Sequence, residues 1–186
     1  AEPMYILASG SPRRRELMNL ITKDFVCEVS GCDEFVPDGT PPCELPALLA
    51  RQKAQAVAKE HPSDIVIGSD TIVVQDGKVF GKPKTPEKAA EMLRALSGKA
   101  HTVYTGVAVV EHGETRSFVQ SADVEFYDLS DELIERYVTT GEPLDKAGAY
   151  GIQGAGALLI KGIVGDYYTI MGFPVAAVAR FLGVIK

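Results

Sequence analysis

The sequence predicts an α/β protein whose helices pack on a sheet. Apolar segments of strand length alternate along the chain with amphipathic helical segments, and no internal repeat or low-complexity segment is visible. Hydrophobic residues make up 46% and charged residues 24% of the sequence, which is typical of a globular protein. A chain of 186 residues has the length of one domain, so residues 1–186 are expected to form a single domain with a sizeable core.

The first elements are predicted from caps and apolar spacing. Residues 4–8 form a short apolar strand, and Ser11 with Pro12 starts a helix, because Ser is a favourable N-cap and Pro suits the first helical turn. The apolar stripe of that helix is expected from Leu17, Met18, Leu20 and Ile21. Residues 30–46 hold four prolines (Pro37, Pro41, Pro42 and Pro46) and are expected to form a loop before a helix at 45–59.

The remaining elements are delimited by turn residues. Asp76-Gly77 and His112-Gly113 predict hairpin turns, and residues 145–172 are Gly-rich and irregular. The expected elements are an extended segment at 65–74, a returning strand at 79–80, a helix capped at Thr85 that stops at Gly98, strands at 103–111 and 118–127, a helix from Ser130 to 140, a strand at 157–160 and a closing helix from Pro174.

Charge and cysteine content exclude several classes of function. The net charge of -6 disfavours nucleic-acid binding, which needs a basic surface, so no nucleic-acid partner is expected. No apolar stretch is long enough to span a membrane, and no secretory signal is visible. The odd set Cys27, Cys32 and Cys43 predicts free thiols in a reducing compartment, hence a cytoplasmic protein. The histidines have no zinc-ligand spacing with them.

Three arginines follow the cap at Ser11, where the helix dipole would favour acidic residues. The preceding Ser9-Gly10 loop and the unpaired N–H groups of the first turn form a ready anion site. Arg13, Arg14 and Arg15 therefore indicate either a bound phosphate or a plain cap with solvated side chains.

Lys53 falls near the middle of the apolar stripe expected for the helix at 45–59. An ammonium group is costly there, so Lys53 either extends past the edge of the stripe into solvent or lies beside a site that holds an anion.

Asp70 interrupts two apolar runs in the string Gly68-Ser69-Asp70-Thr71. A carboxylate on a buried strand needs a cation or a metal, which favours a metal ligand or a general base over a structural role. The string Gly81-Lys82-Pro83-Lys84 follows the hairpin and returns a cation toward Asp70, and Asp33-Glu34 in the Pro-rich loop could bring a second carboxylate.

The segment 145–156 contains many glycines, which allow a close backbone approach to a ligand. Tyr150 could stack on a base, and Gln153 could read a base edge because its amide both donates and accepts. The alternative is a tight structural loop, and neither the P-loop nor the dinucleotide-binding pattern is present.

Together these strings resemble the Maf family of nucleoside triphosphate pyrophosphatases, in the family's order and from residue 6 to residue 174. The matching strings are Leu7-Ala8-Ser9-Gly10-Ser11-Pro12-Arg13-Arg14, Gly68-Ser69-Asp70-Thr71, Gly81-Lys82-Pro83, Leu96-Ser97-Gly98, the segment 145–154, and Gly165-Asp166-Tyr167-Tyr168-Thr169-Ile170-Met171-Gly172.

The resemblance implies a fold related to inosine triphosphate pyrophosphatases, a long bent mixed sheet with flanking helices and two lobes around a deep cleft. It implies hydrolysis of the α–β phosphoanhydride with Mg²⁺ or Mn²⁺, and Asp70 as proton acceptor. Arg13, Thr71 and Gln153 match the specificity positions, and Ser9, Glu34, Lys53 and Lys82 match other residues of the cleft. The string Tyr150-Gly151-Ile152-Gln153 looks like the branch that acts on dTTP and UTP.

Several questions stay open at this level. Asp70 and Glu34 are candidate metal ligands, and a homodimer is one arrangement. The rivals are a regulatory binding protein, since the family name comes from septum formation, and another phosphoryl-transfer enzyme such as a nucleotidyltransferase.

Overall fold

The computed structural model describes residues 2–186, and the chain divides into two compact units. Unit 1 comprises the chain up to Asp70 together with Thr105–Gln120 and Gly172–Lys186, and unit 2 comprises Thr71–Tyr104 and Ser121–Met171. Three strands contribute residues to both units: β3 (Ile65–Gln75), β5 (Ala100–Glu111) and β6 (Glu114–Phe126). The assignment of residues 1–186 to one domain stays a prediction.

The sheet has seven strands in the order β2-β1-β3-β5-β6-β7, with β4 paired to β3. The other strands are β1 (Tyr5–Leu7), β2 (Phe25–Cys27), β4 (Lys78–Phe80) and β7 (Ile160–Val164). Strand β1 is parallel to both β2 and β3, whereas β4 and β7 are antiparallel to their neighbours. The expectation of a mixed sheet with flanking helices is thus confirmed, and that of a deep cleft stays a prediction.

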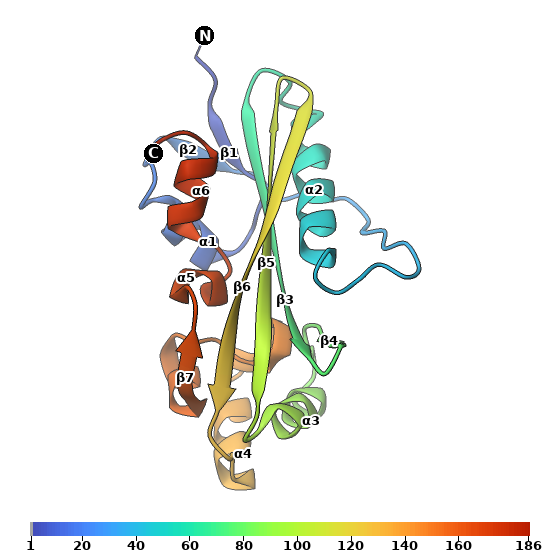
Figure 1. Ribbon diagram of the computed structural model, residues 1–186, viewed down its shortest axis with the longest axis vertical. Helices are drawn as coiled ribbons and strands as arrows, with labels where there is room; N and C mark the ends of the chain where they lie inside the picture. Colours follow the sequence, from blue (N-terminus) through green and yellow to red (C-terminus); the bar gives the residue numbers. More distant parts are fainter. Residues whose placement is uncertain (1) are drawn as a thin grey trace. The chain divides into compact units, whose positions relative to one another are not determined.

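Unit 1 has helices on both faces of its strands. Figure 1 shows α2 (Leu45–Ala58) on one side, and α1 (Pro12–Met18) and α6 (Val175–Phe181) on the other. The buried face of α2 packs on β1, β3 and β5. This core consists of Ile6, Ala8, Ala50, Ala54, Val57, Val66, Ala108 and Val110.

Two glycines allow α2 to lie directly on the strands. A Cβ on Gly68 of β3 would stand 2.3 Å from the carbonyl oxygen of Ala50, and one on Gly106 of β5 would stand 2.3 Å from the carbonyl carbon of Pro46. Any larger residue would force the helix away from the sheet. This close contact decides where the side chains of α2 meet those of β3.

Unit 2 has its own core around α3 (Pro86–Leu96) and α4 (Asp131–Thr139), which pack against the strands. After α4 come three short 3₁₀ segments, η1 (Glu142–Asp145), η2 (Ala147–Ala149) and η3 (Gly154–Leu159), and then β7 and α5 (Tyr167–Met171). The largest buried contributors to this core are Phe80, Leu93, Leu96, Phe126, Ile134, Tyr137, Tyr150 and Leu159.

The predicted helix starts and turns are confirmed. Ser11 Oγ accepts from the backbone N–H of Arg14 at 3.3 Å, and Thr85 and Ser130 cap α3 and α4 in the same way. Both predicted hairpin turns have two residues with positive φ, as a two-residue turn between twisted strands requires.

Other boundaries were predicted wrongly. Helix α1 ends at Met18, so Leu20 is 66% exposed instead of completing an apolar stripe. The strand expected at 157–160 begins only at Ile160, because Gly154–Leu159 forms 3₁₀ turns. Strand β2 and helix α5 were not predicted, since each is too short to show a periodic pattern.

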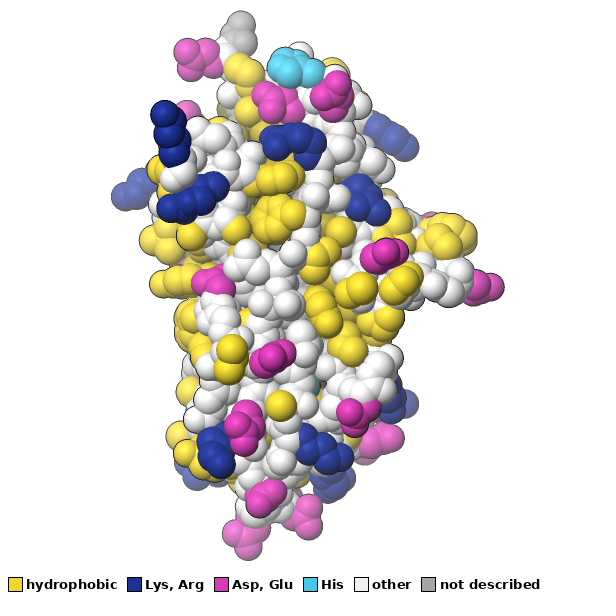
Figure 2. Space-filling model, viewed as in Figure 1, with side chains coloured by type: hydrophobic (Ala, Val, Ile, Leu, Met, Phe, Trp, Pro, Cys, Tyr) yellow, Lys and Arg dark blue, Asp and Glu magenta, His cyan; other side chains and the backbone are white. Residues whose placement is uncertain are grey.

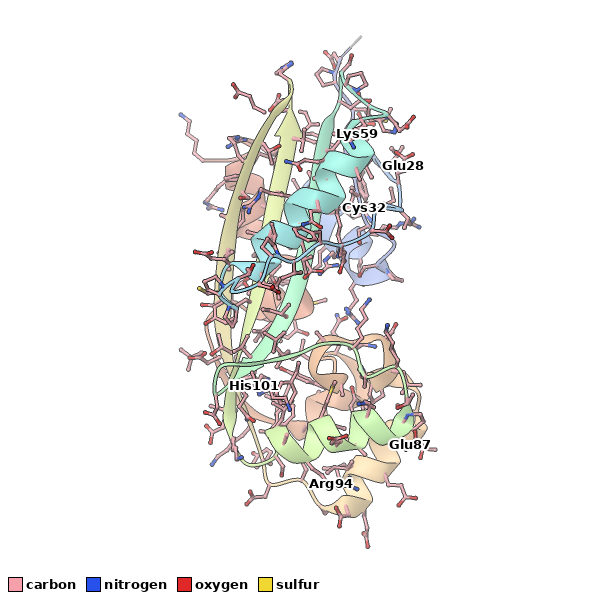
Figure 3. All side chains as sticks on the ribbon, turned by 90° about the vertical axis from the view of Figure 1, so that its right-hand side faces the viewer. Glu28, Cys32, Lys59, Glu87, Arg94 and His101 are labelled. Atoms are coloured by element: carbon pink, nitrogen blue, oxygen red, sulfur yellow. The ribbon has the colours of Figure 1, made fainter. Side chains whose placement is uncertain are left out.

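The expected free thiols are confirmed for Cys27, Cys32 and Cys43. Figure 3 shows Cys32 beside α2, where its Sγ lies 3.8 Å from the carbonyl oxygen of Gln52. None of the helices within residues 2–186 has the length and apolar character needed to cross a membrane. On the face shown in Figure 2, cationic and acidic side chains are interspersed.

Candidate active site

The loop after β1 lies beside β3 in unit 1. Strand β1 pairs in parallel with β3, with Leu7 opposite Ile67, and the backbone N–H of Ala8 donates to the carbonyl of Ile67 at 2.8 Å. The Ser9 hydroxyl then accepts from the backbone N–H of Ser11 at 3.1 Å, just before the capped start of α1. The loop predicted to bind an anion therefore follows β1 next to the parallel strand β3, which continues in the same direction and carries Asp70.

The three arginines of α1 have different surroundings. Arg14 Nε donates to the carbonyl of Gly172 at 2.8 Å, and Arg15 Nε lies 3.4 Å from Cys27 Sγ. Arg13 makes no hydrogen bond or ion pair with the described part of the chain. Arg14 is therefore not one of the solvated side chains of the plain-cap alternative, and a phosphate at Arg13 stays a prediction.

Lys53 forms an ion pair with Asp70. The ammonium nitrogen lies 2.7 Å from Asp70 Oδ1 and 3.9 Å from Glu34 Oε1. The side chains of Lys53 and Asp70 are only 22% and 15% exposed, so the pair is largely removed from solvent. Lys53 therefore does not extend into solvent but pairs with carboxylates of the protein itself, and the expectation that it lies beside a site for a bound anion stays a prediction.

The position of Lys53 on α2 agrees with the expectation. The buried residues of the helix are Pro46, Ala47, Leu49, Ala50, Ala54 and Val57, and at about 100° per residue Lys53 falls between Leu49 and Val57. Gly68 and Asp70 are two residues apart on β3 and therefore point to the same side of the strand. Because Gly68 brings α2 into contact with β3, Lys53 is close enough to pair with Asp70.

Ser69, between these two residues, points to the other face and is fully buried. Its hydroxyl lies within hydrogen-bonding distance of the carbonyls of Gly106 (3.0 Å) and Gly172 (3.2 Å). The three residues after Ile67 thus have separate roles. Gly68 packs on α2, the Ser69 hydroxyl contacts β5 and the segment just before α6, and Asp70 supplies the carboxylate that pairs with Lys53.

The sequence marked Arg14 only as one of three arginines at a helix start, and its link to Asp70 was missed. Burial lowers the pKa of the Arg14 guanidinium, the negative charge of Asp70 opposes that shift, and Arg13 adds to it. Arg14 is therefore a second cation close to Asp70. Its spacing of three and four residues from the buried Leu17 and Met18 places it on the inner face of α1, a signal that the sequence contained.

The residues that could hold a metal ion are Asp70 and Glu34. Both carboxylates approach one ammonium group, that of Lys53, at 2.7 Å for Asp70 and 3.9 Å for Glu34. No three His, Cys, Asp or Glu side chains within residues 2–186 are arranged to hold a metal by themselves. Two carboxylates fit the way Mg²⁺ is usually bound, by one or two carboxylates together with waters and substrate phosphates.

Unit 2 contains the other predicted site residues. Strand alternation points Thr71 to the face opposite Asp70. The Gly81 carbonyl accepts from the N–H of Gly148 at 3.2 Å, and the N–H of Lys84 donates to the carbonyl of Leu144 at 3.2 Å. The exposed Lys82 therefore lies on a segment that runs beside the Gly-rich chain leading to the exposed Gln153.

The suggestion that Tyr150 stacks on a base is wrong. Tyr150 is buried in the unit 2 core, edge-on to Phe126, and its hydroxyl lies 2.6 Å from His101 Nε2. Burial, with a smaller effect of Tyr137, raises the pKa of the Tyr150 hydroxyl, so it stays protonated and serves as a structural hydrogen-bonding group.

Comparison with known proteins places these features in a family. The family model described as Maf-like protein matches residues 4–185. The dTTP/UTP pyrophosphatase of Bacillus cytotoxicus is 48% identical over 178 residues, which is 96% of this chain and 93% of that protein. The dTTP/UTP pyrophosphatase of Halalkalibacterium halodurans is 48% identical over 179 residues, 96% of this chain and 94% of that protein.

Solved structures show the same fold at low sequence identity. The Staphylococcus aureus Ham1 protein has a TM-score of 0.54 and 16% identity, covering 98% of this chain and 99% of its own. A HAM1 protein from Coxiella burnetii has a TM-score of 0.54 and 14% identity, covering 98% and 100%. These likenesses confirm the predicted α/β architecture.

Proposed function

This chain belongs to the Maf-like protein family, and on that premise we propose that it is a hydrolase acting on nucleoside triphosphates. It cleaves the α–β phosphoanhydride and releases a nucleoside monophosphate and pyrophosphate. The observation that carries the proposal is the Lys53–Asp70 pair with Glu34 beside it, next to the capped start of α1. Partly shielded charges of both signs at a helix start suit a polyphosphate and a divalent cation.

Asp70 acts as the proton acceptor. The oxygen of a water molecule forms a bond to the α-phosphorus while the bond between that phosphorus and the bridging oxygen breaks. Pyrophosphate leaves with the electron pair, and the proton of the water passes to the Asp70 carboxylate. Lys53 holds Asp70 Oδ1 at 2.7 Å, which fixes the orientation of the carboxylate.

The phosphates are bound by cations. Arg13 has no partner among residues 2–186 and lies in the first turn of α1, next to Ser9, so it is available for a phosphate oxygen. Lys82 is exposed in unit 2 and supplies a further positive charge. A divalent metal, Mg²⁺ or Mn²⁺, would be held by Asp70 and Glu34, and when bound it would neutralise phosphate charge and polarise phosphoryl oxygens.

The preferred substrates are dTTP and UTP, as the names of the relatives suggest. Thymine and uracil present an acceptor, a donor and an acceptor along one edge. The Gln153 amide can accept from N3–H and donate to a carbonyl at the same time, and its exposed position leaves both groups available. Thr71 is the further specificity position. The three free thiols suit a reducing compartment, so we assign the enzyme to the cytoplasm.

Product analysis tests the proposal. The protein is incubated with a panel of nucleoside triphosphates and Mg²⁺ in water enriched in oxygen-18. The products are separated, and mass spectrometry identifies which of them carries the label. We expect monophosphate and pyrophosphate, with the label in the monophosphate because water attacks the α-phosphorus.

Each rival function gives a different result. A nucleotidyltransferase would transfer the nucleotidyl group only when an acceptor is present, and a binding protein would release nothing. Label in the pyrophosphate, or release of a diphosphate and orthophosphate, would contradict the proposed site of attack.

A further inference from the structure

The loop that carries Gln153 is fastened at both ends by two side chains of unit 2. The backbone N–H of Gly151 donates to the Tyr137 hydroxyl at 3.0 Å, and the N–H of Gly156 donates to Glu142 Oε1 at 3.4 Å. The Tyr137 hydroxyl donates in turn to the same Glu142 oxygen at 2.9 Å. One connected pair, which we call the Tyr137–Glu142 clamp, therefore holds the beginning and the end of the loop.

Two glycines of the loop, Gly154 and Gly156, are required by this clamp. A Cβ on Gly156 would stand 1.8 Å from the carbonyl oxygen of Gly151 and 2.9 Å from the Tyr137 hydroxyl, so the two ends of the loop touch each other above the tyrosine. Gly154 has φ +67°, and a Cβ there would stand 3.1 Å from Glu142 Oε2. The glycines thus allow the loop backbone to lie against the clamp, in addition to any close approach to a ligand.

The clamp itself is anchored to the core. Tyr137 lies on the inner face of α4 and is almost fully buried. The backbone of Glu142 is fixed from both sides: its N–H donates to Thr140 Oγ1 at 3.2 Å, and its carbonyl accepts from Lys146 Nζ at 2.8 Å. The carboxylate is thereby held where both the Tyr137 hydroxyl and the N–H of Gly156 can donate to it.

Gln153 lies between the two fastened ends and differs from them. It is exposed, and its amide makes no hydrogen bond with the described residues. A rigid backbone beneath a side chain with free hydrogen-bonding groups is the arrangement that lowers the entropic cost of recognising a ligand.

From this arrangement we propose that Tyr137 and Glu142 are positioning residues that determine base selectivity by holding the Gly151–Gly156 loop and thereby orienting Gln153. The inference rests on the proposed function, because it assumes that Gln153 contacts the base. Neither residue contacts substrate in this proposal; both act through the loop.

Two variants and two controls test the clamp. Tyr137→Phe removes only the hydroxyl and keeps the buried ring, and Glu142→Ala removes the shared acceptor. As a first control, Glu142→Gln keeps one side-chain oxygen that can accept both hydrogen bonds and should keep the loop fastened. As a second control, Glu135→Ala removes a carboxylate from the exposed face of α4, the helix that carries Tyr137. Amide exchange followed by mass spectrometry should show faster exchange over residues 150–157 in the first two proteins only.

Selectivity supplies the second measurement. The ratio of kcat/KM for UTP to that for CTP should fall by about fivefold to tenfold in Tyr137→Phe and Glu142→Ala, mainly through a higher KM for UTP, and stay near the wild-type value in both controls. A ratio within about twofold of wild type in both variants would overturn the proposal. So would an equal loss of kcat on both nucleotides, which indicates a merely structural role.

A failure of the proposed function would look different, since wild-type protein would then release no pyrophosphate from any nucleotide. In that case the dissociation constants of UTP and CTP are measured by calorimetry on the same proteins. Their ratio replaces the ratio of kcat/KM values, and the same twofold limit decides the proposal.

Discussion

The two units hold their predicted functional side chains in opposite ways. In unit 1, Lys53 and Asp70 bind each other, and Glu34 approaches the same ammonium group. In unit 2, Lys82 and Gln153 are exposed and make no hydrogen bond with described residues, while the backbone that carries Gln153 is fixed by Tyr137 and Glu142.

The difference follows from the tasks proposed for each unit. Charged groups that are partly removed from water need a partner before substrate arrives, since an unpaired buried charge is costly. A group that reads a base must keep its donors and acceptors free, so its position has to be fixed through the backbone. The predictions below test this division, from the largest expected effect to the smallest.

Asp70→Asn should have the largest effect. The variant keeps the shape of the side chain but removes its ability to take up a proton, and we expect turnover to fall by about 10²–10⁴-fold with the fold retained. Steady-state release of pyrophosphate measures the loss, and Asp38→Asn, in the exposed loop before α2, is the matched control. Turnover within tenfold of wild type would remove Asp70 from the reaction.

Acid should weaken unit 2 through His101, which is labelled in Figure 3. Its side chain is 3% exposed, and burial lowers the pKa of the imidazole to about 4, although Asp123 opposes the shift. The unfolded chain takes up the proton near pH 6.5, so stability present above that pH is lost as pH falls toward 4. The loss amounts to about 3 kcal/mol below pH 4.

Thermal unfolding between pH 7 and pH 4 measures this effect. His101→Gln cannot titrate and can still bond the Tyr150 hydroxyl, so its Tm should decline less steeply in this range than that of the wild type. His112→Asn, in the exposed β5–β6 turn, should keep the wild-type slope. Identical slopes in the His101 variant and the wild type would show that the buried imidazole does not govern the acid response.

Gly68→Ala tests whether close packing sets the charge pair of unit 1. The new Cβ would meet the Ala50 carbonyl at 2.3 Å, so α2 must shift, at a cost of about 1–3 kcal/mol, and Lys53 should move away from Asp70. We expect lower stability in urea and lower turnover together. Gly31→Ala, at a position where no atom lies within 4 Å of the added Cβ, should change neither stability nor turnover. Normal turnover in Gly68→Ala would show that the Lys53–Asp70 pair does not depend on the packing of α2 on β3.

Gln153→Ala should have the smallest effect and leave the fold intact. Wild-type protein is expected to prefer UTP over CTP by at least about tenfold in kcat/KM, because cytosine would leave donors or acceptors unpaired. The variant should lose most of that preference with little change in kcat or Tm. Gln153→Glu, which accepts but cannot donate, distinguishes hydrogen-bond reading from shape, and equal UTP and CTP constants in the wild type would refute base reading by Gln153.

Much of the fold was predictable because its signals are local. Ser11, Thr85 and Ser130 cap the helices that they predict, and Asp76-Gly77 and His112-Gly113 form the expected turns. Where the local signal was weak, the boundaries were wrong. Strand β2 has only three residues and owes its existence to pairing with β1, and Gly154–Leu159 forms 3₁₀ turns in a segment whose apolar residues suggested a strand.

The site was predictable in residue type but not in arrangement. The need of Asp70 for a cation and the misplaced charge of Lys53 were visible separately, but their pairing depends on Gly68 and Gly106, whose closeness to α2 is a tertiary fact. Tyr150 was misassigned because a tyrosine in a Gly-rich string resembles a stacking residue, and only its burial against Phe126 and His101 excludes this.

The Gly172 carbonyl accepts a hydrogen bond from Arg14 and lies within hydrogen-bonding distance of Ser69. These contacts limit the order in which parts of the protein can form during synthesis. The contact with Arg14 joins residues separated by 158 positions, and unit 1 includes the final segment Gly172–Lys186. A growing chain on the ribosome cannot complete this part of unit 1 until Gly172 has been translated, whereas the residues of unit 2 are all synthesised earlier. The contacts of Gly172 with Arg14 and Ser69 can therefore form only after every residue of unit 2 has been synthesised.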